Sequence, residues 1–566
     1  MLNTFKYFLP EELRKAVNAE SNSWRDADII GRIWQKDASV WTGRDEAKWL
    51  GWLDIVDEEL ADLQKYRDLD SDLAAAGFTD TLLMGMGGSS LCPEVLAITF
   101  GKTTFHILDS TVPAQVKAVE DKLDLKRTLF VVASKSGSTL EPNCFKQYFF
   151  DRVSQLVGAE NAGKQFVAIT DPGSKMEQVA KQDGFRHIFY GRPQIGGRFS
   201  ALSAFGMTAA ASMGIDVERF LTNAAEMALA CRSTDVSDNC GATLGLVLGV
   251  CHAQGRDKLT IFTSPEIHDL GAWLEQLVAE STGKNGVAII PVDREPVPAS
   301  KVGTNNYSND RVFAFLSLKD DAEMDAKYAA MVAAGHPAVR IELESIENLG
   351  QEFFRWEFAT AVAGAVMKLN PFDQPDVEAA KIEARKITDE YEKTGSLPIE
   401  APFFDGEGCS LFTSHEYAQK LSGAAQGSSL ADIVRAHLLQ IVSGDYFAVL
   451  AYVEMNERTE KLLQSIRGKV LDKKGVATCL GFGPRFLHST GQAYKGGTNN
   501  GVFLQITSDD ASDLHVPGQK YTFGVVKSAQ ARGDFQVLID RGRRALRIHL
   551  GSDVIAGLEK VLEMIQ

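Results

Sequence analysis

The stretch TLLMGMGGSS at residues 81–90 decides the fold, because it combines a short apolar run with a loop of small residues. Three further stretches repeat this pattern: TTFHILDST at 103–111, TLFVVASKSGST at 128–139 and QFVAITDPGS at 165–174. Segments with helical character stand between them, such as CFKQYFFDRVSQLV at 144–157. Strands that alternate with helices predict a parallel sheet with helices on both faces, so the expected fold class is α/β.

The same rhythm returns further along the chain. Four more apolar runs are expected to be strands: KLTIFTSP at 258–265, GVAIIPV at 286–292, RVFAFLSL at 311–318 and AVRIELE at 338–344. A long helix is expected from about 351 to 369, and prolines and glycines between 398 and 408 indicate a boundary near residue 400. Beyond it, strands are expected at 446–455, 501–507, 521–526, 535–540 and 545–551.

These patterns divide the 566 residues into four parts. They are a helical lead-in over 1–75, a first α/β unit over 76–235, a second over 236–399, and a third α/β or α+β unit over 400–566. The first two units are each expected to hold a doubly wound parallel sheet. The division agrees with the length, since one domain typically holds ~100–200 residues.

Composition limits the partners. The chain has 59 basic and 75 acidic residues and a net charge of −16, with no basic run to offset it, so nucleic acid and membrane surfaces are not expected to bind. No window approaches the ~20 apolar residues of a membrane span. Residues 1–10 do not resemble a secretion signal, and seven scattered cysteines suit a reducing compartment, so a cytoplasmic location is expected. The ten histidines show no metal-binding spacing, and no metal is expected.

The loop after the first strand contains Gly85, Gly87 and Gly88. In open parallel sheets, ligands bind beyond the carboxyl ends of the strands. The spacing Gly85-x-Gly87-x-x-Ser90 lacks the third glycine of the dinucleotide fingerprint, although Asp109 stands at the distance of an acidic partner for a ribose. A nicotinamide site and a structural turn are therefore alternatives. We favour a loop that holds an anion through Gly88 and Ser89.

The loop after the third strand is rich in hydroxyl groups. Its residues are Ser134, Lys135, Ser136, Gly137, Ser138 and Thr139. Hydroxyls together with the N–H groups of a following helix N-terminus suit the oxygens of a phosphate. The alternative is a helix cap, but a cap needs one hydroxyl and this loop has four. We therefore predict that this loop binds a phosphate, and no cofactor is expected. The loop is not a Walker motif, because no Gly-Lys-Ser/Thr ending is present.

Three longer segments are similar to signatures of the glucose-6-phosphate isomerase family. They are GGRFSALSAFG at 196–206, EQLVAESTGK at 275–284 and NPFDQPDVEAAK at 370–381, the last in its bacterial form. With the glycine loop they give four matches in order over residues 85–381. The resemblance implies two sugar-isomerase phosphate-binding domains and interconversion of glucose 6-phosphate and fructose 6-phosphate, a step of glycolysis and gluconeogenesis. An isomerase of a related sugar, such as a mannose phosphate or a 6-sulfo-sugar, and a non-catalytic sugar-phosphate sensor are the alternatives.

The resemblance also assigns roles. Glu280 would be the base that moves a proton between neighbouring carbons, and Arg198 would stabilise the enediolate. Lys381 would assist ring opening. Gln276 and Gln374 would bind sugar hydroxyls or water. Lys135, Arg198 and Lys381 would form a positively charged pocket for the sugar phosphate, and Lys495 is a weaker candidate for the same pocket.

One family segment is out of order. In short bacterial members, a Leu-His-Ser-x-Gly-Gln segment follows the catalytic glutamate and supplies the ring-opening histidine. In this chain the interval between Glu280 and Lys381 holds only one histidine, His336, whereas LHSTGQ stands at 487–492. We therefore predict that His488 of the third unit opens the ring, with His336 as the alternative. The tail resembles the C-terminal part of the bacterial fusion of transaldolase with glucose-6-phosphate isomerase, and a homodimer and a transaldolase partner are both compatible with it.

Overall fold

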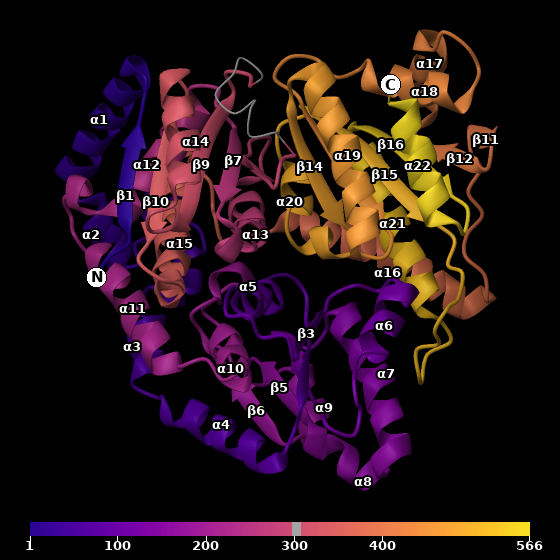
Figure 1. Ribbon diagram of the computed structural model, residues 1–566, viewed down its shortest axis with the longest axis horizontal. Helices are drawn as coiled ribbons and strands as arrows, with labels where there is room; N and C mark the ends of the chain where they lie inside the picture. Colours follow the sequence, from indigo (N-terminus) through magenta and orange to yellow (C-terminus); the bar gives the residue numbers. More distant parts are fainter. Residues whose placement is uncertain (297–306, 566) are drawn as a thin grey trace.

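The computed structural model describes residues 1–296 and 307–565 and contains three sheets (Figure 1). The first sheet has the order β3-β2-β4-β5-β6, with all strands parallel. Its strands are β2 (Asp80–Met84), β3 (Phe105–Leu108), β4 (Thr128–Ala133), β5 (Phe166–Thr170) and β6 (His187–Tyr190). The connecting helices include α5 (Leu91–Thr99), α6 (Pro113–Glu120), α7 (Leu140–Val157) and α9 (Lys175–Gln182). The predicted α/β class is confirmed, because the parallel strands alternate with helices that cross over from one strand to the next.

The second sheet has the order β1-β10-β9-β7-β8. Its parallel strands are β7 (Lys258–Thr263), β8 (Ile290–Asp293), β9 (Arg311–Leu318) and β10 (Ala338–Leu343). The lead-in was expected to be helical throughout, and this is wrong at its start, where β1 (Thr4–Phe8) pairs antiparallel with β10. The partner stands more than 300 residues away in the chain, so local sequence patterns could not reveal it. β1 covers the free edge of β10.

The third sheet has the order β11-β12-β16-β15-β13-β14. Its strands are β11 (Phe404–Gly406), β12 (Cys409–Phe412), β13 (Tyr446–Tyr452), β14 (Ala477–Phe482), β15 (Gly501–Ser508) and β16 (Arg544–Leu550). The strands expected at 521–526 and 535–540 are wrong, because the chain there forms α21 (Phe523–Asp540). β15 and β16 are parallel neighbours, so their connection must cross over, and a short apolar run does not by itself distinguish helix from strand.

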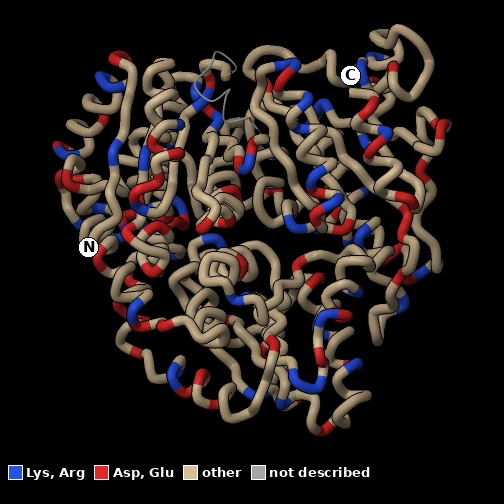
Figure 2. Tube along the Cα trace, viewed as in Figure 1, with Lys and Arg blue, Asp and Glu red and all other residues tan. Residues whose placement is uncertain are grey.

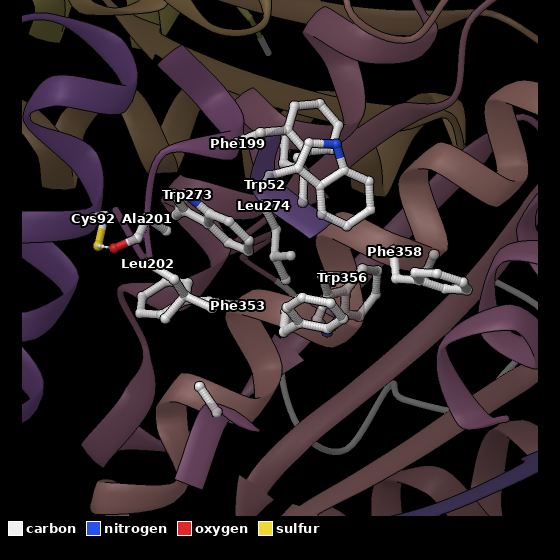
Figure 3. Packing of buried hydrophobic residues seen from close by; sticks show 14 of the residues in the cluster. Trp52, Cys92, Phe199, Ala201, Leu202, Trp273, Leu274, Phe353, Trp356 and Phe358 are labelled. Carbon is white, nitrogen blue, oxygen red and sulfur yellow. Dashed lines mark hydrogen bonds between the residues drawn. The ribbon is translucent and has the colours of Figure 1, made fainter. Parts of the chain in front are cut away.

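The largest core joins the first two sheets. At its centre is α15 (Leu349–Val366), which is buried on all sides from Leu349 to Gly364. Figure 3 shows Trp52, Phe199, Trp273 and Phe353 packed together, with ring centroids 5.3 Å apart for Trp52 and Phe199 and 4.8 Å for Trp273 and Phe353. Phe199 follows Arg198 directly, so this core anchors the turn that carries the arginine.

The third unit shares cores with both others. Its Phe523 stacks on Phe145 of α7 at 6.1 Å, and Tyr446 and Tyr494 lie in one cluster with Ile290 of β8. Helices α5, α13 (Leu270–Thr282) and α20 (Gly491–Gly496) lie where the three units meet (Figure 1). Lys and Arg are interspersed with Asp and Glu along all three units (Figure 2). The junction therefore brings residues from distant parts of the chain together.

Gly88 allows two turns of the first unit to approach closely. It lies in the turn η3 (Gly87–Ser89), and a Cβ added to it would stand 1.9 Å from the carbonyl oxygen of Gly197 in the turn η5 (Gly197–Phe199). We expect Gly88→Ala to lower the free energy of unfolding by about 1–3 kcal/mol, because the two backbones must separate. Chemical denaturation measures this.

The matched control is Gly423→Ala in α17 (His415–Ala424). A Cβ there meets no atom within 4 Å, and alanine favours a helix more than glycine does. Equal stability of the Gly88 variant and the wild type would contradict the steric argument.

Candidate active site

A cavity of about 670 Å³ opens at the carboxyl ends of the first sheet's strands. It lies between the loop after β4, one face of α16 (Pro375–Thr394) and the segment around His488. The predicted phosphate loop contributes Ser136, Ser138 and Thr139 to its wall. Three parts of the chain that are distant in sequence thus line one space.

The side chains of the predicted phosphate loop differ in their hydrogen bonding. Ser134 is buried, and its hydroxyl has no hydrogen-bond partner among the described residues. The hydroxyl oxygens of Ser136 and Ser138 lie 2.7 Å apart. Thr139 precedes α7, yet within residues 1–296 and 307–565 its side chain makes no capping bond. The helix-cap alternative therefore finds no support, and the first turn of α7 lines the cavity.

Lys135 behaves differently from its neighbours. Its ammonium lies 2.7 Å from the carboxylate of Asp171 and donates a hydrogen bond to the carbonyl of Arg192 at 3.0 Å. Burial lowers the pKa of Lys135, and the Asp171 partner opposes this effect. Asp171 thus compensates the lysine charge, and direct phosphate binding by Lys135 stays a prediction.

The glycine loop packs against protein rather than leaving space for a dinucleotide. Ser89 is buried, and the Ser90 hydroxyl donates to an Asp109 carboxylate oxygen at 3.2 Å. The carboxylate of Asp109 is bound by Arg485 of the third unit at 2.8 Å. Asp109 was the acidic partner that a nicotinamide site would need, and it is already engaged.

Arg198 is buried beside Glu280. The guanidinium lies 3.4 Å from Oε1 of Glu280, and its own exposed fraction is 2%. It donates hydrogen bonds to Ser281 Oγ at 2.8 Å, Gln374 Oε1 at 3.0 Å, Pro371 O at 2.6 Å and Asp373 O at 3.0 Å. Burial lowers the pKa of Arg198, and the charges of Glu280 and Asp373 counteract this. The three segments that carried the family resemblance therefore meet at one guanidinium.

Gln276 links this pair to the third unit. One helical turn before Glu280, its amide Nε2 donates to Oε2 of Glu280 at 3.0 Å and to the main-chain carbonyl of His488 at 2.8 Å. A Cβ on Gly87 would lie 2.7 Å from the same amide nitrogen, so only glycine leaves room for it. A single side chain thus connects the predicted base and the turn that holds the predicted ring-opening histidine.

His488 projects into the cavity and pairs with Glu141 of α7. Its Nε2 lies 2.8 Å from Oε1 of Glu141, which also accepts from Gln530 at 2.6 Å. Burial alone would raise the pKa of Glu141, but the charge and hydrogen bond of His488 outweigh it and hold the pKa below its usual value. Lys381 lines the same cavity, with 42% of its side chain exposed.

Two other candidates lie elsewhere. His336 is buried in the second unit, where its ring stands 5.2 Å from that of Phe313. Lys495 was a candidate for the positively charged pocket, and this is wrong, because its ammonium forms a buried ion pair with Asp534. Burying an ammonium without such a partner would be costly.

Comparison with known proteins agrees with this geometry. Residues 70–306 match the family model "Phosphoglucose isomerase". The chain carries a phosphoglucose isomerase domain. A glucose-6-phosphate isomerase of Methanocaldococcus jannaschii is 26% identical over 367 residues, which cover 59% of this chain and 88% of the relative. One of Rubrobacter xylanophilus is 28% identical over 365 residues, covering 54% and 81%.

Two solved structures share the fold. A hypothetical protein of Thermus thermophilus has a TM-score of 0.59 at 24% identity and covers 67% of this chain and 99% of its own. A glucose-6-phosphate isomerase from Chlamydia trachomatis has a TM-score of 0.56 at 19% identity and covers 69% and 88%.

The candidate site also contains residues to which the sequence analysis gave no role. Lys284 ends the 275–284 segment, and its ammonium donates to Asn370 O and Asp373 Oδ1, both at 2.8 Å. Burial, then repulsion from Arg198, lowers the pKa of Lys284 to about 8. Lys284 thus holds the 370–374 turn under Arg198. Glu141 was missed as well, although it stands two residues after the hydroxyl-rich loop.

Among the described residues, no group of His, Cys, Asp and Glu gathers as a metal site would require.

The Glu141 pair predicts an acid-side loss of stability. The lowered pKa of Glu141 means that its ionised form stabilises the fold above the usual carboxyl value of 4.5, and this contribution disappears as the pH falls through the folded-state pKa. We expect Glu141→Gln to lower the free energy of unfolding at neutral pH and to weaken its fall on acidification. Denaturation at a series of pH values measures both.

Glu120→Gln is the control, because Glu120 also has a lowered pKa, held by Arg152 and Tyr148 in the same unit. It should change acid stability without disturbing the His488 pair. An unaltered pH dependence in Glu141→Gln would contradict the assigned pairing.

Proposed function

We propose that this chain is a glucose-6-phosphate isomerase, which interconverts glucose 6-phosphate and fructose 6-phosphate. The observation that carries the proposal is the Glu280 carboxylate, which lies 3.4 Å from the Arg198 guanidinium and accepts a bond from Gln276 at 3.0 Å. Aldose–ketose isomerisation needs a base at the reacting carbons and a cation for the enediolate. The phosphoglucose isomerase domain and the names of its relatives support the same activity.

The substrate phosphate would bind at the hydroxyl-rich loop. Ser136, Ser138 and Thr139 line the cavity, and the N-terminus of α7 adds main-chain donors. Lys381 supplies an ammonium from the opposite wall. Hydroxyl, main-chain N–H and ammonium donors suit a compact dianion, whereas the net charge of −16 does not favour nucleic acid.

Ring opening would use His488 with Lys381. A proton is delivered to the ring oxygen O5 while the hydroxyl on C1 loses its proton, so that the C1–O5 bond breaks and C1 becomes a carbonyl. The Glu141 carboxylate, 2.8 Å from Nε2, would hold the imidazole ring in place.

The proton transfer itself would belong to Glu280. Its carboxylate removes the proton on C2, and the electron pair moves toward the C1 carbonyl to give an enediolate. Arg198 holds the oxygen charge without releasing its own proton. Glu280 then returns the proton to C1, while the hydroxyl proton passes from O2 to O1 and C2 becomes the carbonyl of the ketose.

The cytoplasm is the proposed location of this activity. None of the helices in the described ranges is long and apolar enough to cross a bilayer. The homodimer and the transaldolase partner stay predictions from the sequence.

Glu280→Gln is expected to lower kcat by at least ~10²–10⁴-fold with little change in KM, because the amide keeps the shape but accepts no proton. A coupled assay of fructose 6-phosphate conversion measures this, with mannose 6-phosphate tested in parallel. Glu323→Gln on the exposed face of α14 (Ala322–Ala333) is the control. Activity within threefold of wild type would remove Glu280 from the mechanism, and faster turnover of mannose 6-phosphate by the wild type would reassign the substrate.

His488→Ala should leave proton transfer intact but abolish catalysed ring opening. We expect overall conversion to become limited by spontaneous opening of the sugar, so that the rate stops rising as enzyme is added. Turnover measured over a range of enzyme concentrations tests this. The control is His336→Ala, which should keep the wild-type dependence on enzyme concentration. Normal kinetics in His488→Ala together with a folded but impaired His336→Ala would assign ring opening to His336.

A further inference from the structure

A second side chain of the His488 turn reaches across to the first unit. The turn η10 (Arg485–His488) begins with Arg485, whose side chain is only 16% exposed. Its guanidinium meets two carboxylates at once. The contacts are Nη1 to Glu94 Oε2 at 2.6 Å, Nη2 to Glu94 Oε1 at 2.8 Å, Nε to Asp109 Oδ2 at 2.8 Å and Nη2 to Asp109 Oδ1 at 3.0 Å. The Glu94 contact is thus bidentate. From this guanidinium Asp109 accepts one hydrogen bond, donated by Nη2, and among the described residues Nε makes none.

The two carboxylates belong to the elements that frame the glycine loop. Glu94 lies in the first turn of α5, directly after the loop, and Asp109 follows the end of β3. The Ser90 hydroxyl joins them by donating to Asp109 at 3.2 Å. Arg485 of the third unit therefore binds the residues on either side of the glycine loop. Gly87 of the same loop leaves room for Gln276.

Three contacts consequently hold one short turn. The side chain of Arg485 binds the first unit, the ring of His488 binds Glu141 of the first unit, and the carbonyl of His488 accepts from Gln276 of the second. The ring and carbonyl contacts both involve His488 itself. Arg485 adds a restraint at the other end of the turn, because a bidentate pair with Glu94 restrains both distance and direction.

We infer that Arg485 is a positioning residue for ring opening, which places His488 over the cavity by binding Glu94 and Asp109. The inference rests on the proposed function and extends it to a residue that does not touch the substrate. A misplacement of a catalytic group by about 1 Å can lower a rate ~10²-fold, so loosening this contact should be visible in kcat.

Arg485→Lys keeps the charge but loses the fork, so the turn should become mobile while the buried carboxylates keep a partner. In the otherwise wild-type chain we expect kcat for fructose 6-phosphate to fall by ~10–10²-fold with KM within about twofold. In a His488→Ala background, compared at enzyme concentrations low enough that the rate still rises with added enzyme, the same change should alter kcat by less than about twofold, because its effect passes through the histidine. Glu94→Gln should show the same dependence on His488.

The matched control is Arg467→Lys. Arg467 is also a buried arginine of the third unit, and it donates to the Asp293 carbonyl of the second unit at 2.9 Å. It should lower stability without a kinetic effect that depends on His488. Denaturation of every variant separates folding from kinetics, and Glu94→Gln provides the test if Arg485→Lys does not fold.

An equal fold-loss with and without His488 would overturn the inference and leave Arg485 a structural residue. An unchanged kcat in both Arg485→Lys and Glu94→Gln would also overturn it. An inactive wild type would instead contradict the proposed function, so the two failures are distinguishable.

Discussion

The buried guanidinium of Arg198 is the constraint on which the site depends. A charge with 2% exposure must be matched by nearby acceptors, since an isolated buried ion is costly. The acceptors come from α13 and from the turn before α16, and the ammonium of Lys284 donates to a carbonyl of that turn. Packing Phe199 into the largest core then prevents the arginine from turning away. The candidate pair of Glu280 and Arg198 is therefore held in place by the acceptors that surround the guanidinium.

Hydrogen bonds from the other two units likewise bring the third unit to the site. His488 is held by a carboxylate of the first unit, through its ring, and by an amide of the second, through its main chain. Gln276 contacts both Glu280 and the His488 carbonyl, so the two ends of the proposed reaction are linked by one side chain. A chain whose segments are rearranged can keep such a site, because the contacts depend on positions in space and not on order along the sequence.

Sequence patterns predicted the parallel sheets well, since their strands are continuous apolar runs that end in loops of small residues. They failed where a partner is distant or a run is short. β1 was missed because its partner β10 is more than 300 residues away, and 521–540 was assigned to strands although it forms α21. Lys495 was misjudged for a similar reason, because the position of its partner Asp534 depends on the folding of the third unit.

The sequence by itself determined the α/β class, and it indicated the loop at 134–139 as a phosphate-binding candidate and Glu280 and Arg198 as catalytic candidates, because these depend on local runs and on motifs with characteristic spacing. It also indicated His488, through a six-residue segment. Only the tertiary structure decided that Glu141, Gln276 and Arg485 hold that histidine, and that Asp109 is occupied. Hydrogen bonds and ion pairs form between groups that meet in space. Their partners stand up to several hundred residues apart, so no local pattern encodes them.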